Sequence, residues 1–540
     1  MAFIKAQKLV YDGNGNITSG SAAIVDTQYG NFGTYHAKHT VREKLGKVQW
    51  LSKDKKIGIF MSETRGLVEY NAVTDVFSPV EKDDKRLNGT ETFPEGRIHT
   101  VFGDSYMLLK FLENERLIPV LKSVFQKNPD YERLLCHILH GVLKDGSKIS
   151  CDDFISKSFA SYILSDVPLA SLRSDTYFFT MMGDDRTRIA FFSQFVKMMR
   201  KENPEFGKGC YVDSTPLPND IEENPFNAIS SHGTGTAGIM ERLVLVLDEQ
   251  TGLPVWYDVI PGNVLDINTI MKVIDDVAVS IDVNIDSMVL DAGYVSKELV
   301  TAFHIGSEKT FIGRMPARRG FPHKELYWEM KPLLGKGKYT FVRNKHVYFG
   351  HKKKITLFGQ EVYAYIYVDQ NNALKGYQSY LFDLEDGEFS KLKDCDKDWM
   401  TVKFGFFILV SNIDTTPEDM LTRYFGRCEI ETVFKTSKEY LDLLPLSKWT
   451  DTTVRGKILS DIINTIVFLL LRKKINSSGN STTELYGKTQ SLMCWHDKNG
   501  IVTVEQPNKQ VKDFYKILGI MLPSHVEENS FREKNLRIKK

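Results

Sequence analysis

A series of β-rich segments in the middle of the chain constrains the fold more than any other feature. Residues 242–247 (RLVLVL) form a continuous β-rich run, and a turn-like EQTG separates them from a second β-rich run at 253–260. Two such runs joined by a short polar turn predict a β-hairpin. An amphipathic helical segment at 267–280 then precedes another apolar strand at 287–290. Strands that alternate with helical segments in this way predict a mixed α/β core.

The composition is that of an ordinary globular protein. The chain has 540 residues, of which 42% are hydrophobic and 26% charged, so a disordered or fibrous protein is excluded. The 70 Lys and Arg residues nearly balance the 69 Asp and Glu residues, which by itself argues against a nucleic-acid-binding protein. The longest apolar run, 462–471, is too short to span a membrane. Because no apolar run is long enough to span a membrane, we expect no membrane association. The six cysteines lack any C-x-x-C spacing, so we expect a reducing cytoplasm.

Changes of texture along the sequence divide the chain into six segments. Residues 311–404 contain four runs in which apolar and polar residues alternate, as they do in strands, and one of these runs is YQSYLFDLE at 377–385. The expected segments are an N-terminal β-containing module (1–100), a helical region (101–205), the first part of the core (206–310), the β-rich basic insertion (311–404), the second part of the core (405–480) and a C-terminal region (481–540).

Two carboxylates stand at the ends of predicted strands. Asp213 closes the short apolar run GCYVD, and Asp291 follows the strand SMVL. Adjacent strand ends can bring two such groups within a few ångströms, which is what hard divalent cations require. The alternative is that each Asp only begins a turn, as Asp residues after strands often do. Taken alone, each residue favours the turn.

A third set of polar residues lies on a predicted helix. Thr416 followed by Pro417 and two acids is a typical helix start, and the helix is expected to run to about Leu441. At about 100° per residue, four polar side chains of this helix fall within about 60° of one another. They are Tyr424, Arg427, Glu431 and Lys438. Such a stripe suits a surface for phosphate and metal. An i,i+4 ion pair with a lysine reaching to water is an equally good interpretation.

A glycine string resembles a cofactor-binding loop only in its letters. Gly233, Gly235 and Gly238 have the G-x-G-x-x-G spacing of a dinucleotide-binding turn. In that motif a strand precedes the glycines and a helix follows them, whereas here the predicted strand 242–247 follows. We therefore expect no nicotinamide or flavin cofactor.

Three separate blocks of the chain resemble the catalytic regions of the DDE transposases of the insertion-sequence-four family. The blocks are YVDST at 211–215, VLDAGY at 289–294 and the spacing Y-x2-R-x3-E-x6-K at 424–438. The segment 254–266 (PVWYDVIPGNVLD) is similar to the hairpin strand and turn of that family. The resemblance covers 209–310 and 405–475, and the β-rich segment falls where this family carries an insertion.

The resemblance implies an RNase H-like catalytic core and phosphodiester chemistry. In this family Asp213, Asp291 and Glu431 would be catalytic and would bind two Mg²⁺ ions per active site, with Mn²⁺ as a substitute. Tyr424, Arg427 and Lys438 match positions that hold the DNA backbone near the cleaved end. The resemblance also implies a homodimer in the synaptic complex and a bacterial, cytoplasmic protein that joins the nucleoid when bound to DNA.

The positive charge of the chain is concentrated in two segments. Residues 308–354 hold thirteen Lys and Arg and three acids, interleaved with aromatic residues, as suits a nucleic-acid backbone. The alternative is a solvated, aggregation-resistant sheet edge. Residues 38–56, with seven basic residues and two acids, are expected to help recognise DNA ends. The near-neutral total therefore hides a polarised chain. Predicted DNA contacts in the first segment are Arg314, Arg318, Arg319, Lys352, Lys353 and Lys354.

These features together predict a cut-and-paste transposase that acts on double-stranded DNA. Its substrates would be the terminal inverted repeats of its own element and a target DNA. Two alternatives remain at this point. One is an RNase H-like nuclease that cleaves without strand transfer, and the other is a catalytically inactive or domesticated DNA-binding protein.

Overall fold

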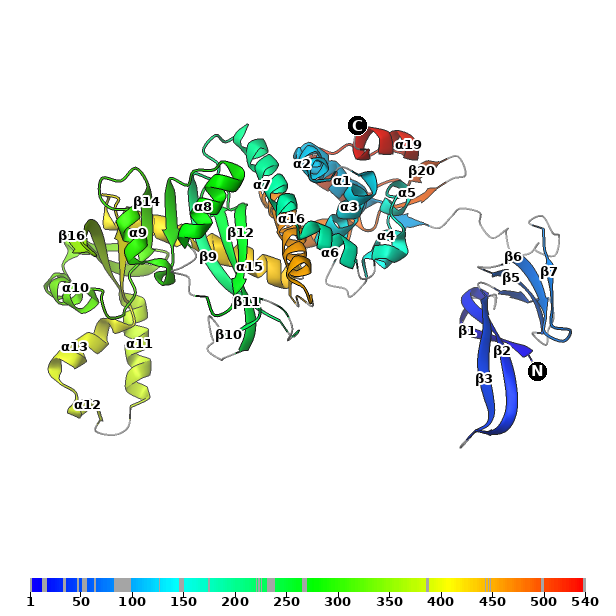
Figure 1. Ribbon diagram of the computed structural model, residues 1–540, viewed down its shortest axis with the longest axis horizontal. Coiled ribbons are helices and arrows are strands. Elements are labelled where there is room, and N and C mark those ends of the chain that lie inside the picture. The colour runs from blue at the N-terminus through cyan, green and yellow to red at the C-terminus, as the bar shows by residue number, and fades with distance from the viewer. Residues whose placement is uncertain are drawn as a thin grey trace. The chain divides into compact units, whose positions relative to one another are not determined.

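The computed structural model contains two compact units, Met1–Ile98 and His99–Lys540, and each is described by itself (Figure 1). The structure describes residues 2–11, 17–32, 35–45, 48–50, 56–62, 65–81, 99–125, 127–144, 150–172, 175–219, 221, 224, 226–230, 238–264, 270–384, 388–441, 443–444, 446, 448–496 and 500–537.

The first unit is built from strands, as the N-terminal sequence predicts. Two antiparallel sheets are present, with the orders β1-β2-β3 and β4-β5-β6-β7. Ile4, Ile24, Phe60 and Tyr70 form a small apolar core that joins the two sheets. The strands are β1 (Ala2–Tyr11), β2 (Ile17–Phe32), β3 (Tyr35–Leu45), β4 (Val48–Trp50), β5 (Ile57–Ser62), β6 (Gly66–Asn71) and β7 (Val76–Pro79).

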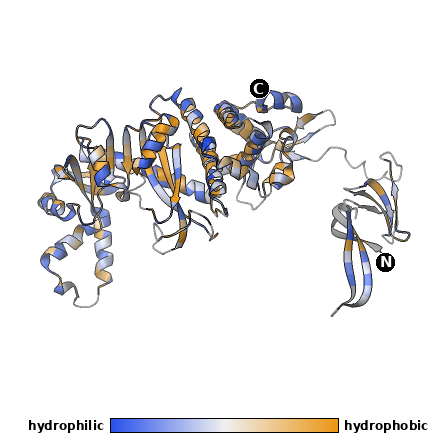
Figure 2. Ribbon diagram, in the orientation of Figure 1, coloured by the Kyte–Doolittle hydropathy of each residue, from blue (hydrophilic) through white to orange (hydrophobic). Residues whose placement is uncertain are grey.

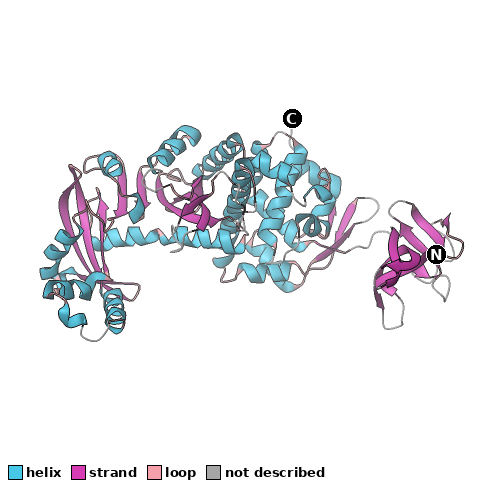
Figure 3. Cartoon of the chain, turned by 60° about the horizontal axis from the view of Figure 1, so that its bottom comes forward, coloured by secondary structure: helices cyan, strands magenta, loops and turns pink. Residues whose placement is uncertain are grey.

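The second unit opens with the predicted helical region. Its helices are α1 (Gly103–Asn114), α2 (Leu117–Val124), α3 (Asn128–Leu143), α4 (Cys151–Ser156), α5 (Ala160–Ile163), α6 (Thr176–Met182) and α7 (Asp185–Arg200). The long helix α16 (Asp451–Asn476) packs against α3 and α6, so it buries the apolar run 462–471 inside the protein. Among the described helices, none is long and apolar enough to cross a membrane. Figure 3 shows most of these helices gathered in one group beside the large sheet, and α7 and α16 contact that sheet.

The C-terminal segment folds back onto the start of the second unit. A small antiparallel sheet has the order β21-β20-β19-β8, so strands from both ends of the unit pair with each other. Arg532 pairs with Glu132 and Asp166 of the helical region, which fixes the last helix there. The elements are β8 (Thr100–Val101), α17 (Thr482–Thr489), β19 (Met493–His496), β20 (Ile501–Val504), α18 (Lys509–Ile517), β21 (His525–Glu527) and α19 (Glu528–Phe531).

A ten-stranded mixed sheet dominates the second unit. The order is β10-β11-β9-β13-β14-β18-β17-β16-β15, and β12 pairs with β11. Strands β9, β13 and β14 are parallel, whereas β11 and β12 form the predicted antiparallel hairpin beside them. The strands are β9 (Gly209–Pro218), β10 (Ala228–Ser230), β11 (Gly238–Asp248), β12 (Pro254–Pro261), β13 (Ser287–Leu290), β14 (Thr310–Arg314), β15 (Thr340–Arg343), β16 (His346–Leu357), β17 (Gln360–Asp369) and β18 (Phe406–Ser411).

This sheet confirms the predicted α/β class. A parallel set flanked by an antiparallel hairpin, with α8 (Ile270–Ile281) crossing between β12 and β13, is the mixed sheet expected of an RNase H-like core. The first residues of the predicted helix, 267–269, lie outside the described residues. In Figure 2, much of the ribbon in this part of the sheet has the colour of hydrophobic residues, in agreement with the runs 242–247 and 253–260 that predicted β11 and β12.

The segment expected as a β-rich insertion is only partly β. Strands β15, β16 and β17 extend the core sheet through β18. The prediction of a strand at 377–385 is wrong, because residues 370–382 form the helix α11 (Gln370–Phe382). Asp369 caps this helix by accepting a hydrogen bond from the Asn372 backbone N–H. Tyr380 and Leu381 follow Tyr377 by three and four positions, so the same run also has the residue spacing of a helix. The segment's other helices are α10 (His323–Met330), α12 (Glu388–Lys391) and α13 (Asp394–Lys403).

Candidate active site

The two aspartates lie on neighbouring parallel strands. Val212 of β9 pairs with Leu290 of β13, so Asp213 and Asp291 follow at the same level of the sheet. Asp291 comes directly after its strand, as predicted. Asp213 does not end its strand, because β9 continues to Pro218 through pairing with β11. The turn interpretation therefore does not account for Asp213.

The predicted helix forms from Pro417 and breaks once. Thr416 caps it by accepting a hydrogen bond from the Asp419 backbone N–H at 3.1 Å. The chain then forms α14 (Pro417–Gly426) and α15 (Cys428–Lys435), followed by one turn of π-helix (Thr436–Tyr440). Gly426 permits the close approach of this helix to the sheet, because a Cβ there would lie 2.1 Å from the Tyr211 Oη of β9. The helix is thereby held beside the strand that carries Asp213.

The side chain of Arg427 brings the three predicted catalytic acids together. Its Nη1 lies 2.5 Å from Asp213 Oδ2, and its Nη2 lies 3.6 Å from Asp291 Oδ1 and 3.7 Å from Glu431 Oε1. The predicted Arg427–Glu431 ion pair therefore exists, but the contact with Asp213 is much shorter. Three blocks separated by about 80 and 140 residues meet at one guanidinium.

The three acids differ in their exposure. The Asp213 side chain is 16% exposed, whereas Asp291 and Glu431 are 42% and 62% exposed. Burial raises the pKa of Asp213 to about 6, although the Arg427 guanidinium acts in the opposite direction. Tyr424 donates a hydrogen bond to Asp291 Oδ1 at 3.3 Å, and burial raises the pKa of its phenol to about 12. The site is thus closed at Asp213 and open at Glu431.

Lys438 points to β9 and not to bulk water. Its Nζ donates hydrogen bonds to Thr215 Oγ1 at 2.6 Å and to the Pro216 carbonyl at 2.7 Å. Both acceptors are neutral, and burial lowers the pKa of this ammonium to about 8. The alternative interpretation, in which Lys438 reaches to water, is therefore wrong for this residue. These two acceptors lie on the same strand as Asp213, two and three residues further on.

A buried arginine on the other face of the strand escaped the sequence argument. Arg242 of β11 is 1% exposed. It donates hydrogen bonds to the Ser214 hydroxyl and, at 2.5 Å, to the Val264 carbonyl. Tyr294, also buried, lies close to the same groups, since both Arg242 and Ser214 act on its pKa. An arginine inside an otherwise apolar strand was the available signal for this residue.

The predicted basic DNA contacts fall into two groups. The three lysines of β16 each have an acidic partner: Lys352 contacts Asp414, Lys353 contacts Glu329 at 2.5 Å, and Lys354 contacts Glu361 at 2.8 Å. The three arginines are exposed, and no acid pairs with any of them in the described part of the chain. Arg314 lies over the Phe407 ring at 5.6 Å, Arg318 lies over Phe321 at 5.7 Å, and Arg319 is on the same loop.

Arg314 also belongs to the neighbourhood of the acids. It lines a cavity of about 300 Å³ together with Tyr424, Phe407 and Phe425. In the first unit, Arg42 of the predicted end-recognition cluster pairs with Asp75 at 2.8 Å. Several basic residues of that cluster, Lys47, Lys53 and Lys55, lie outside the described residues.

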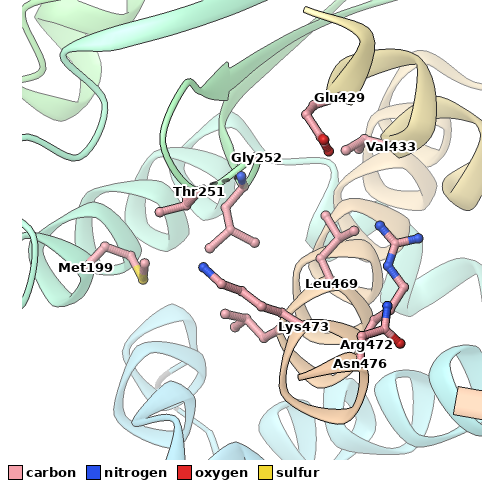
Figure 4. Close-up of a pocket in the computed structure, with 11 residues that line it drawn as sticks. Met199, Thr251, Gly252, Glu429, Val433, Leu469, Arg472, Lys473 and Asn476 are labelled. Carbon is pink, nitrogen blue, oxygen red and sulfur yellow. Dashed lines mark hydrogen bonds between the residues drawn. The ribbon is translucent and has the colours of Figure 1, made fainter. Parts of the chain in front are cut away.

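A second cavity lies apart from the acids. It has a volume of about 270 Å³ and lies between the β11–β12 turn, α15 and α16 (Figure 4). Glu429 of α15 lines it together with Lys473 of α16, whereas Arg427 and Glu431 do not. No predicted site residue contributes to this cavity, so it is separate from the candidate active site.

The three acids fit a hard divalent cation by their chemistry. Carboxylate oxygens are the ligands that Mg²⁺ prefers, and here they already converge on a positive group, the Arg427 guanidinium. As placed around Arg427, they are not a ready-made metal site. Within the described ranges, no group of three or more His, Cys, Asp or Glu side chains could hold a metal ion.

One comparison with known proteins, that with a family model, agrees with this geometry. Residues 205–459 match the family model of the transposase DDE domain, and this stretch contains all three acids. The match spans slightly less than half of the chain and supports a DNA-cleaving and strand-transferring enzyme of the DDE class. No curated protein sequence matches the chain. A piggyBac transposase synaptic complex with hairpin DNA is similar at 12% identity and a TM-score of 0.37, over 81% of this chain and 82% of that chain. A TM-score of this size carries no argument about function.

Proposed function

We propose that this protein is a DNA transposase of the insertion-sequence-four family that cuts and joins the ends of its own element. One observation carries the proposal. Asp213, Asp291 and Glu431 come from three distant blocks and converge on Arg427 within the segment that matches the transposase DDE domain. A chance arrangement of acids would not bring together two neighbouring strands and a helix packed against them at one guanidinium.

Asp213, Asp291 and Glu431 are the residues that would hold divalent metal, Mg²⁺ or Mn²⁺. Two bound ions would supply an activated nucleophile and stabilise the departing oxygen at phosphorus. Asp213 must be ionised to act as a ligand, and its raised pKa of about 6 places that ionisation close to neutral pH. Asp291 and Glu431 face solvent and complete the ligand set from the open side.

The cations and phenol around these acids would position the DNA backbone. Arg427 offers a planar pair of N–H donors that matches a phosphate, and Lys438 supplies a second positive charge beside β9. Tyr424 holds Asp291 through its hydroxyl group. Arg314 lines a cavity together with Tyr424, and Arg318 and Arg319 add exposed positive charge on the loop after β14, which suits a long duplex such as a terminal inverted repeat or a target DNA.

Joining two ends requires two active sites, so we propose a homodimer in the DNA complex. A bacterial cytoplasm with association to the nucleoid would be the corresponding setting. The alternatives, an RNase H-like nuclease and an inactive DNA-binding protein, lack strand transfer and cleavage, respectively. They differ from a transposase in what the protein does to DNA, not in which DNA it binds.

The test uses the full chain with duplex DNA that carries the sequences flanking its own reading frame. The wild-type protein should nick and then join these ends in Mg²⁺, and Glu431→Gln should bind the same duplex but not cleave it. Glu429→Gln, on the same helix but facing the separate cavity, is the matched control and should retain cleavage. Cleavage without joining would indicate the nuclease. Full cleavage by the Glu431 variant would remove the catalytic assignment.

A further inference from the structure

The cation among the three acids is part of the protein itself. The guanidinium of Arg427 is 11% exposed and lies within 2.5–3.7 Å of a carboxylate oxygen from each of the three acids. It therefore fills the position on which the acids converge. This placement explains why the acids do not form a ready-made metal site in the described part of the chain.

A guanidinium and a divalent cation cannot share this position. Mg²⁺ requires carboxylate oxygens at about 2.0–2.1 Å in a nearly octahedral arrangement. Arg427 keeps the oxygens of Asp291 and Glu431 turned to its own Nη2 at 3.6 and 3.7 Å. Two positive groups at such short range also repel each other strongly in a partly buried site. Binding of a divalent cation by these acids thus requires the Arg427 side chain to move away.

The contacts of Arg427 are suited to such a movement. Its Nε is buried without a hydrogen-bond partner among the described residues, so the side chain is incompletely satisfied where it lies. Only the contact with Asp213 is short, and the other two acids open to solvent. A DNA phosphate arriving from that side would offer the guanidinium a bidentate, doubly hydrogen-bonded partner.

We propose that Arg427 is an internal counterion that occupies the cation site of the DNA-free protein and leaves it for a DNA phosphate. Divalent metal then binds strongly only when DNA is bound. The inference rests on the proposed function, because that function supplies both the metal and the phosphate. By linkage, DNA and metal must raise each other's affinity by the same factor. Metal loading is thereby restricted to the enzyme that already holds its substrate.

The test measures Mn²⁺ binding to the full-length protein without DNA, from the electron paramagnetic resonance signal of free Mn²⁺. Arg427→Gln should bind Mn²⁺ at least tenfold more tightly than the wild type, because the acids lose their internal partner. Arg423→Gln is the matched control: it removes the same charge one turn earlier on α14, and no acid pairs with Arg423 among the described residues. Its Mn²⁺ affinity should remain within about twofold of the wild type.

A second substitution tests whether the tighter Mn²⁺ binding takes place at the three acids. Adding Asp213→Asn to Arg427→Gln should abolish the tighter binding, since Asp213 makes the shortest contact with the guanidinium. If Arg427→Gln does not fold by circular dichroism, Arg427→Lys replaces it. Its shorter ammonium cannot contact three acids at once, so a smaller gain in the same direction is expected.

Two results would overturn the proposal. One is an Arg427 variant that binds Mn²⁺ no more tightly than Arg423→Gln, and the other is a gain that persists after Asp213→Asn. Failure of the proposed function looks different. A wild-type protein that cleaves DNA while the Arg427 variants show no gain refutes only the counterion role. A clear gain in Mn²⁺ affinity with a wild type that cleaves no DNA refutes the transposase.

Discussion

The close approach of the Glu431 helix to the sheet depends on a single glycine, Gly426. A Cβ at this position would lie 2.1 Å from Tyr211 Oη and 3.0 Å from Tyr211 Cζ, both far inside normal contact. Tyr211 lies two residues before Asp213 on β9. Gly426→Ala should therefore push the helix with Glu431 away from the strand with Asp213. Overpacking of this kind costs about 1–3 kcal/mol.

Gly487 provides a matched control for this substitution. It lies in the helix α17, where a Cβ would meet nothing within 4 Å. Gly487→Ala should therefore stabilise the protein by about 0.5–1 kcal/mol, the usual gain from replacing a helical glycine by alanine. The two variants carry the same chemical change and differ only in the space available. Opposite shifts in stability are thus expected from one and the same substitution.

The assay combines thermal unfolding followed by circular dichroism with Mg²⁺-dependent DNA cleavage. Gly426→Ala should lower the unfolding midpoint and the cleavage rate, whereas Gly487→Ala should raise the midpoint and leave cleavage unchanged. Adding Tyr211→Phe to Gly426→Ala removes the atom at 2.1 Å but not the ring carbon at 3.0 Å, so partial recovery is expected. A Gly426 variant as stable and active as the Gly487 variant would refute the role of this contact in placing Glu431.

Two further predictions concern charge. Glu241 of β11 is fully buried, and burial raises its pKa from 4.5 to about 7. The unfolded chain therefore loses this proton at a lower pH than the folded protein does, so the free energy of unfolding falls as the pH rises from about 4.5 through 7. Glu241→Gln should thus match the wild type near pH 4.5 and exceed its unfolding free energy by up to about 3 kcal/mol at pH 8; equal stability at both pH values would contradict this. Replacing Arg318 and Arg319 by alanine should weaken duplex binding and reduce its salt dependence, since each lost phosphate contact lowers the slope by about one. The same change at Lys353 and Lys354, which already have acidic partners, should have a smaller effect in the same gel-shift titration.

Local sequence features determined most of the core elements. The apolar runs 242–247 and 253–260 formed the hairpin β11–β12, because burial on both faces selects a continuous apolar strand. Thr416 and Pro417 started their helix where expected, because a cap satisfies free N–H groups within a few residues. The residue types of the candidate site were equally visible, since carboxylates, a guanidinium and a phenol recur at a recognisable spacing.

Alternation of apolar residues was a less reliable guide. It predicted a strand at 377–385, where the structure has α11, a helix in which only Ala373 is buried. A helix with so little buried surface leaves a weak periodic signal, and tyrosines fit either conformation. The cap that decided the matter, Asp369 with Asn372, comes before the run that was read as a strand.

The tertiary structure alone decided what the charged groups do. Arg427 and Asp213 are 214 positions apart, so no local pattern could state that one guanidinium would lie among three acids. Likewise, Lys438 turned to β9, and the lysines of β16 found acidic partners on other elements. The sequence by itself determined which groups exist and which elements carry them, because hydrophobic periodicity and capping act over a few residues. Their pairing depends on which distant elements pack together, and only the folded sheet determines that.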